Sequence, residues 1–218
     1  MRVTVVYESL FGNTRTLAEA IAEGIRAAVP GADVSCIPVA EAGPAAAEAD
    51  LLVAGGPTHF LGMTSQRSRR MARQYWAQAT GGAGRTAGDA PPAGPGVREW
   101  LATLPAGGGH LAAAFDTRLD TLFPGSAARL IGRILRDQGY QIIAAPEGFT
   151  VTAMQGPLSP GEQERAKAWG AELADSLRQP GPASSRRPSR LRQGGPGSHD
   201  EAGMEGSRAA RRLRRSGD

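Results

Sequence analysis

Cysteine, histidine and aromatic residues are all scarce in this sequence of 218 residues. Its single cysteine, Cys36, allows neither an intramolecular disulfide nor a cysteine-based metal cluster, which fits a reducing compartment. Only three histidines are present, and no Ser-His-Asp set or metal-ligand cluster stands out among them, so we expect no metal site. Aromatic residues make up 5% of the chain, and a core must therefore be built mainly from Val, Leu, Ile and Ala.

Long apolar runs are also lacking. No segment approaches the ~20 apolar residues that a membrane-spanning helix needs. The N-terminal residues MRVTVVYESL do not combine a basic region with a long apolar stretch, as a signal peptide would. The sequence predicts a soluble, cytoplasmic protein without a membrane partner.

The positive charge is concentrated near the C-terminus. The chain carries a net charge of +4, but residues 179–218 hold nine arginines and four acidic residues and so carry +5, which leaves about −1 on residues 1–178. The same forty residues are rich in Gly, Pro and Ser and contain only two large aliphatic residues, Leu191 and Leu213. Such a segment buries too little apolar surface to offset its ordering entropy, and it is predicted to be a disordered basic tail. Arginine outnumbers lysine 24 to 1, which is typical of GC-rich codon usage, so we do not favour a nucleic-acid partner.

Residues 1–178 alternate between β-rich and helical patterns. Strands are expected at 2–7, 33–37, 50–55, 110–115 and 141–144, the last resuming at 149–152. Helices are expected at 14–28, 44–49 and 126–138 and after a capping box that runs from Ser159 to Glu162. This order predicts an α/β fold, a doubly wound five-stranded parallel sheet of order 2-1-3-4-5. A ligand would then lie at the carboxyl ends of the first, third and fourth strands.

Residues 61–104 form a long insertion between the third and fourth strands. We expect a helix at 64–79, a Gly- and Pro-rich loop at 80–96 and a short helix at 97–104. Four arginines gather in the first of these helices: Arg67, Arg69, Arg70 and Arg73. They would suit an acidic partner protein or nucleic acid, whereas a solvated helix face is the commoner explanation and the one we favour.

The first strand runs directly into the polar loop of VVYESLFGNT, residues 5–14. Gly12 allows close backbone approach, Ser9 supplies a hydroxyl, and the positive end of the following helix points into the same space. These features favour an anion held by backbone N–H groups, and the alternative is a plain turn with a polar helix cap. The loop has neither the lysine of a Walker motif nor the glycine spacing of a dinucleotide fingerprint. The third strand ends in Ala-Gly-Gly-Pro and so lacks the aspartate of a receiver domain.

The pattern V-V-Y-x-S-x-x-G-x-T-x-x-x-A-x-x-I over residues 5–21 resembles the flavodoxin signature. The resemblance implies that the cofactor is FMN, with its phosphate wrapped by hydroxyls and amides of this loop. The residues that it implicates are Ser9, Leu10, Phe11, Gly12, Asn13 and Thr14. Many flavodoxins have threonine where Phe11 stands, and the flavodoxin-like NAD(P)H:quinone oxidoreductases have an aromatic residue there.

Two later loops complete the expected site. The loop GGPTHFLGM resembles, in its Pro-Thr-x-Phe part, the quinone oxidoreductase loop that borders the flavin ring, and it implicates Pro57, Thr58, His59 and Phe60. Phe60 would otherwise simply anchor the insertion. The loop FDTRLDTLFPGS would add contacts from Asp116, Thr117 and Arg118, with Phe123 in place of the stacking tyrosine of flavodoxins. A surface ion pair between Asp116 and Arg118 is the favoured alternative for the arginine.

These features predict an FMN-binding, flavodoxin-like redox protein in which the cofactor performs the chemistry and no side chain acts as a catalytic acid or base. Its expected partner is a redox protein or a small acceptor such as a quinone, with NAD(P)H as a candidate donor. The function is either electron transfer or that of a small FMN-dependent NAD(P)H:quinone-type reductase. The alternative from another class is a flavodoxin-fold binding or regulatory module that has lost FMN.

Overall fold

The computed structural model describes residues 1–59, 61–80, 94–121 and 125–178. Phe60, Phe123, most of the loop expected at 80–96 and the C-terminal tail lie outside these residues. No helix in the described ranges is long and apolar enough to cross a membrane.

The centre of the fold is a parallel sheet. Its strands are β1 (Arg2–Tyr7), β2 (Asp33–Pro38), β3 (Leu51–His59), β5 (Leu111–Leu119), β6 (Gln141–Ile142) and β7 (Glu147–Val151). They are arranged in the order β2-β1-β3-β5-β6, and β7 pairs with β5 further along the same edge. The predicted order 2-1-3-4-5 is confirmed, with a fifth strand that is split into β6 and β7.

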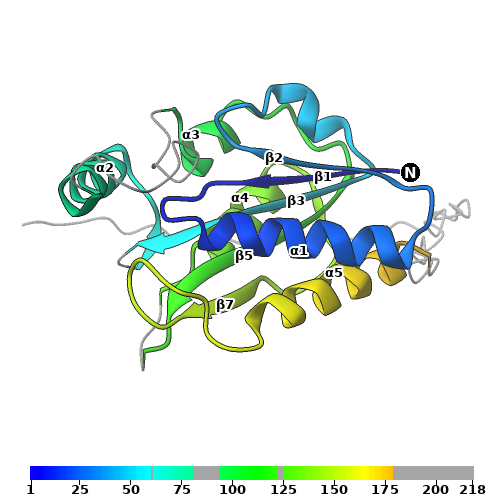
Figure 1. The fold of residues 1–218 in the computed structure, drawn as a ribbon. Helices are drawn as coiled ribbons and strands as arrows, with labels where there is room; N and C mark the ends of the chain where they lie inside the picture. The colour runs from blue at the N-terminus through cyan, green and yellow to red at the C-terminus, as the bar shows by residue number, and fades with distance from the viewer. Residues whose placement is uncertain (60, 81–93, 122–124, 179–218) are drawn as a thin grey trace, which may run out of the picture. The chain divides into compact units, whose positions relative to one another are not determined.

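Helices cover both faces of this sheet (Figure 1). On one face lie α1 (Asn13–Ala28) and α5 (Glu162–Arg178), and on the other lie η1 (Pro44–Glu48), α3 (Val97–Leu101) and α4 (Ala127–Asp137). Neighbouring residues of a strand point to opposite faces, so Val5 joins the core under α1 and α5 while Val6 joins the core under α4. Both cores consist mainly of aliphatic side chains and alanine, as the composition requires.

The helices α1 and α5 approach each other through glycines. A Cβ on Gly24 would lie 1.9 Å from the carbonyl oxygen of Lys167, and one on Gly170 would lie 2.2 Å from that of Ile21. Both distances are far below van der Waals contact, so the helices can pack this closely only because neither residue has a side chain.

Several predicted boundaries differ from the structure. The strand expected to end at Gly55 continues to His59, and the one expected to end at Phe115 continues to Leu119, because the parallel pairing of β3 and β5 extends to the Pro57–Thr117 pair. Pro57 is tolerated because β1 ends opposite Gly55, which leaves no strand beyond it on that side. The end of β3 also forms a two-residue antiparallel pairing with β4 (Gly62–Met63). This hairpin, which precedes α2 (Gln66–Thr80), was not predicted.

The expected capping box of the last helix is wrong. The helix α5 begins at Glu162, whose carboxylate accepts a hydrogen bond from the Thr150 amide at 2.8 Å and pairs with Arg165. Ser126, with which the helix expected at 126–138 starts, is the N-cap of α4, since its hydroxyl accepts a hydrogen bond from the amide of Arg129 at 3.1 Å.

Candidate functional site

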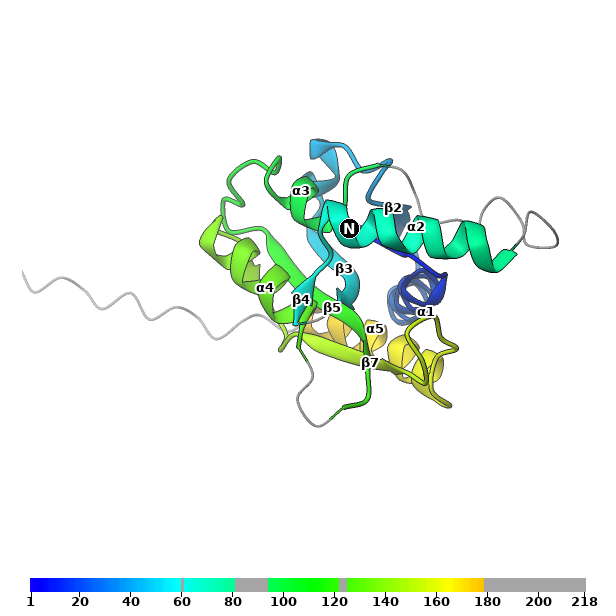
Figure 2. The same cartoon turned by 90° about the vertical axis from the view of Figure 1, so that its left-hand side faces the viewer.

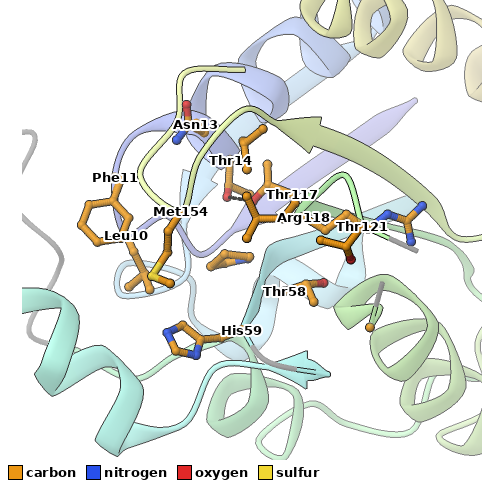
Figure 3. A pocket seen from close by; sticks show the side chains of 14 residues that line it. Leu10, Phe11, Asn13, Thr14, Thr58, His59, Thr117, Arg118, Thr121 and Met154 are labelled. Atoms are coloured by element: carbon orange, nitrogen blue, oxygen red, sulfur yellow. Dashed lines mark hydrogen bonds between the residues drawn. The ribbon is translucent and has the colours of Figure 1, made fainter. Parts of the chain in front are cut away.

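A cavity of about 280 Å³ opens at the carboxyl ends of β1, β3, β5 and β7 (Figure 3). Nine of the predicted site residues line it: Leu10, Phe11, Asn13, Thr14, Pro57, Thr58, His59, Thr117 and Arg118. Three others, Ser9, Gly12 and Asp116, are neighbours of these residues in the chain but do not line the cavity. The sequence patterns of three separate loops therefore converge on one site.

The loop between β1 and α1 is held in shape by its own residues. Gly12 has a φ of +90°, which a residue with a side chain adopts only with strain. The hydroxyl oxygen of Ser9 accepts hydrogen bonds from the amides of Gly12 at 3.1 Å and Arg15 at 3.3 Å. Ser9 therefore shapes the loop from within.

Most of the amides in this loop have no partner. Within the described residues, no hydrogen bond is formed by the backbone N–H groups of Ser9, Leu10, Phe11, Asn13 and Thr14. The last two are the first amides of α1, where the helix dipole adds partial positive charge. The loop thus presents a cluster of donors suited to an anion.

A hydrogen bond 2.9 Å long joins the hydroxyls of Thr14 and Thr117 across the cavity wall. Both residues are buried, and the bond links the start of α1 to the end of β5. A hydroxyl has one donor and two acceptor sites, so one O–H group of the pair is left to donate to a ligand.

Thr58 and His59 form the wall on the β3 side. The hydroxyl oxygen of Thr58 accepts from the amide of Ala127, the first residue of α4, at 2.8 Å. His59 is half-buried, and burial lowers its pKa below the ordinary value of 6.5. The imidazole is therefore mainly neutral at pH 7.

The carboxylate of Asp116 accepts hydrogen bonds from residues at the N-terminus of α4. Its Oδ2 accepts from the hydroxyl of Ser126 at 2.8 Å and from the amide of Ala128 at 2.9 Å, and the residue is fully buried. Burial raises its pKa despite these hydrogen bonds. The Nε of Arg118 lies 3.8 Å from Oδ1, so the expected ion pair exists but involves a buried carboxylate.

Sequence patterns missed part of the lining. Five further residues border the cavity: Leu119, Thr121, Gly125, Val151 and Met154. Val151 is the last residue of β7 and Met154 comes shortly after it, and the carboxyl end of this strand reaches the same edge as those of β1, β3 and β5. Asn13 fixes this last segment by donating from Nδ2 to the carbonyl oxygen of Gln155 at 2.9 Å. Including the fifth strand in the search for the site would have found it.

A buried ionic network joins the loop to the insertion. The carboxylate of Glu8 accepts from the Thr64 hydroxyl at 2.6 Å and the Val97 amide at 2.8 Å, and Nη1 of Arg69 lies 4.0 Å away. Arg69 also pairs with Glu99 at 3.0 Å. Arg69 is 3% exposed, so the prediction of a solvated face is wrong for this arginine. Burial raises the pKa of Glu8, and this carboxylate ties the starts of α2 and α3 to the end of β1.

Comparisons with known proteins agree with this architecture, although no family model matches the chain. A 100-residue match, 36% identical, links it to a protein of Gluconacetobacter diazotrophicus named NAD(P)H dehydrogenase (quinone). The match covers 37% of this chain and 47% of that protein, so it spans about half the length of the curated relative.

Solved structures provide the broader likeness. A flavodoxin from the domain Archaea has a TM-score of 0.55 at 22% identity, covering 82% of this chain and all of that one. Flavodoxin 1 from Bacillus cereus has a TM-score of 0.53 at 16% identity, covering 80% and 98%. The flavodiiron core of Flv1 from Synechocystis has a TM-score of 0.53 at 19% identity, covering 82% and 36%. The strand order and these likenesses together show that the chain has the flavodoxin-like fold.

Proposed function

We propose that this chain is a redox protein that binds FMN in the cavity between α1, β3, β5 and β7. The cluster of unpaired amides at the start of α1 carries the proposal, because a phosphate dianion would satisfy donors that are otherwise left without acceptors. The free O–H group of the Thr14–Thr117 pair would add a side-chain donor.

The remaining walls suit a flat, largely apolar ring. Leu10, Phe11, Pro57, Val151 and Met154 provide apolar surface in the cavity. The hydroxyls of Thr58 and Thr121 add polar atoms to its lining. Such a site, mostly apolar with a few placed polar groups, is typical of cofactor pockets.

FMN, when bound, supplies the transfer of one or two electrons, and the protein supplies binding and access. His59 would present a neutral imidazole to the ring, because burial disfavours its charged form. Asp116 is occupied by the amide and hydroxyl at the start of α4 and holds that wall in place. No side chain of the cavity is therefore assigned a proton-transfer role.

Binding of FMN is tested by titrating the purified full chain with FMN and with riboflavin, which lacks the phosphate. We expect FMN to bind at least ~100-fold more tightly, since each hydrogen bond to a charged group contributes about 1.5–3 kcal/mol. Thr14→Val should reduce the preference for FMN about tenfold. Thr103→Val is the matched control, because its hydroxyl bonds only to the carbonyl of Trp100 in α3. A protein that takes up neither flavin would instead support the alternative function, that of a flavodoxin-fold binding or regulatory module that has lost FMN.

The relative named NAD(P)H dehydrogenase (quinone) supports reductase activity as the more specific version of this function. The matching test is NADH or NADPH oxidation by the FMN-loaded protein with a soluble quinone. Steady turnover that depends on both substrates identifies a reductase. If there is no turnover although dithionite still reduces the bound FMN, the protein is a carrier that needs a partner protein.

A further inference from the structure

We propose that the outer face of α2 is a docking surface for an acidic protein. This α2 face consists of Arg67, Arg70, Met71, Gln74 and Tyr75, all of them exposed. Met71 is 51% exposed and Tyr75 48% exposed, which makes them two of the most exposed large apolar side chains among the described residues.

The inner side of α2 is firmly attached, and this defines which side faces outward. Ser65 and Ser68 cap the helix reciprocally: each hydroxyl accepts a hydrogen bond from the other residue's amide, at 2.8 and 3.2 Å. Ser68, Arg69 and Ala72 are buried, and Arg69 enters the network with Glu8 and Glu99. At 3.6 residues per turn, Arg67, Arg70 and Gln74 point away from this buried side, whereas Met71 and Tyr75 lie exposed along its border.

The composition of the α2 face is that of a protein interface. Tyr, Met and Arg are enriched in the centres of such interfaces, while Lys, Asp and Glu are depleted there. The α2 face contains two arginines, one methionine and one tyrosine, and none of the three depleted residues occurs in α2. The row Arg67, Met71, Tyr75 follows the i, i+4 spacing, so apolar and cationic groups lie side by side.

Charge identifies the partner as acidic. Within the described residues, neither Arg67 nor Arg70 forms an ion pair, and the helix itself offers no carboxylate. A second copy of the chain in a two-fold contact through this face would bring like charges together. A nucleic acid would engage the arginines but would leave Met71 and Tyr75 without a role, whereas an acidic protein with an apolar centre would use both.

The α2 face is close to the cavity. The helix starts three residues after β4, which pairs with the end of β3 where His59 lines the cavity. Figure 2 shows α2 crossing the edge of the sheet at which the cavity opens. A protein docked there would lie beside the mouth of the cavity, and its role as an electron donor or acceptor rests on the proposed function.

The test measures binding of the full chain, without FMN, to polyglutamate, to a glutamate–tyrosine copolymer and to a 20-base-pair DNA duplex. Omitting FMN makes the result independent of the proposed function. The reversal R67E/R70E should weaken binding of both polypeptides about tenfold. The neutral change M71S/Y75S should weaken binding of the copolymer alone. The matched control R133E/R136E makes the same charge change on the exposed face of α4 and should leave the binding of both polypeptides nearly unchanged. It therefore accounts for the effect of net charge, including that of other basic segments of the chain, on binding.

Circular dichroism should show that all variants remain folded, since every substituted side chain is on the surface. The proposal is overturned if the α2 variants bind the polypeptides as the control does. It is also overturned if the duplex binds more tightly than the copolymer and only the arginine reversal weakens it, because the face would then bind nucleic acid. A concentration-dependent dimer that M71S/Y75S dissociates would overturn it in favour of a second copy.

Discussion

Replacement of Glu8 by alanine tests whether the buried network holds the insertion to the sheet. The change would leave the amide of Val97 without its acceptor and remove the acceptor of the Thr64 hydroxyl. A buried polar group left unpaired costs about 1–3 kcal/mol, and breaking a buried ion pair costs about 3–5 kcal/mol. Because Arg69 keeps Glu99 at 3.0 Å, we expect a loss near the lower end, about 3 kcal/mol of unfolding free energy.

Urea unfolding followed by circular dichroism measures this loss. Glu8→Gln keeps one acceptor oxygen and should cost less than the alanine variant. Glu19→Ala is the surface control, because its ion pair with Arg15 is half-exposed and contributes less than about 1 kcal/mol. An alanine variant within about 1 kcal/mol of the wild type would refute the reasoning. In the alanine variant, the backbone amides of both α2 and α3 should exchange their hydrogens faster than in the wild type.

The difference in stability between the wild type and Glu8→Gln should depend on pH, and the sign of this dependence follows from the pKa of Glu8. Burial raises the pKa of Glu8 above its ordinary value of 4.5, so the folded protein binds this proton more readily than the unfolded chain. The resulting stabilisation is complete below pH 4.5 and is lost as the pH rises through the raised pKa. The stability of the wild type relative to Glu8→Gln should therefore fall over that range. A rise over the same range would contradict the assigned burial cost.

Three further predictions concern the site and the helices. Burial lowers the pKa of His59, so its contribution to stability is present above pH 6.5 and is lost as the pH falls through the lowered value; His59→Gln should flatten this part of the stability curve. Gly24→Ala should lower the melting temperature by several degrees, because the new Cβ would collide with the carbonyl oxygen of Lys167. This collision should outweigh the helix propensity of alanine, which exceeds that of glycine by about 1 kcal/mol. Gly43→Ala is the control and should be nearly neutral, since the space around Gly43 is open. Phe11→Thr should raise the preference for FMN over riboflavin by restoring a hydroxyl in the loop; an unchanged preference would mean that residue 11 does not face the phosphate.

The sheet order was predictable because it depends on patterns that are local in the sequence. Each strand of the expected fold is a short apolar run, and a right-handed parallel arrangement leaves few alternatives for their order. The loop from Ser9 to Thr14 was equally readable, because its glycine, hydroxyls and helix start lie within six residues. Such features need no knowledge of distant contacts.

Other features depend on contacts between distant residues and could not be read in this way. Gly55-Gly56-Pro57 looks like the end of a strand, yet pairing with β5 carries β3 onward to His59. Arg69 looks like one of four equivalent surface arginines, and only the buried carboxylate of Glu8 distinguishes it. Nothing near either residue in the sequence indicates these partners.

The glycine contact between α1 and α5 also has a consequence for folding kinetics. These helices are joined by an ion pair between Glu23 and Lys167, residues 144 positions apart in the chain. Contacts so distant in sequence form late, because loop closure must precede them. During synthesis the apolar side of α1 and the sheet face beneath it remain uncovered until α5 has been made. Chains truncated before Glu162 should therefore aggregate, and soluble expression should depend on how quickly this helix docks.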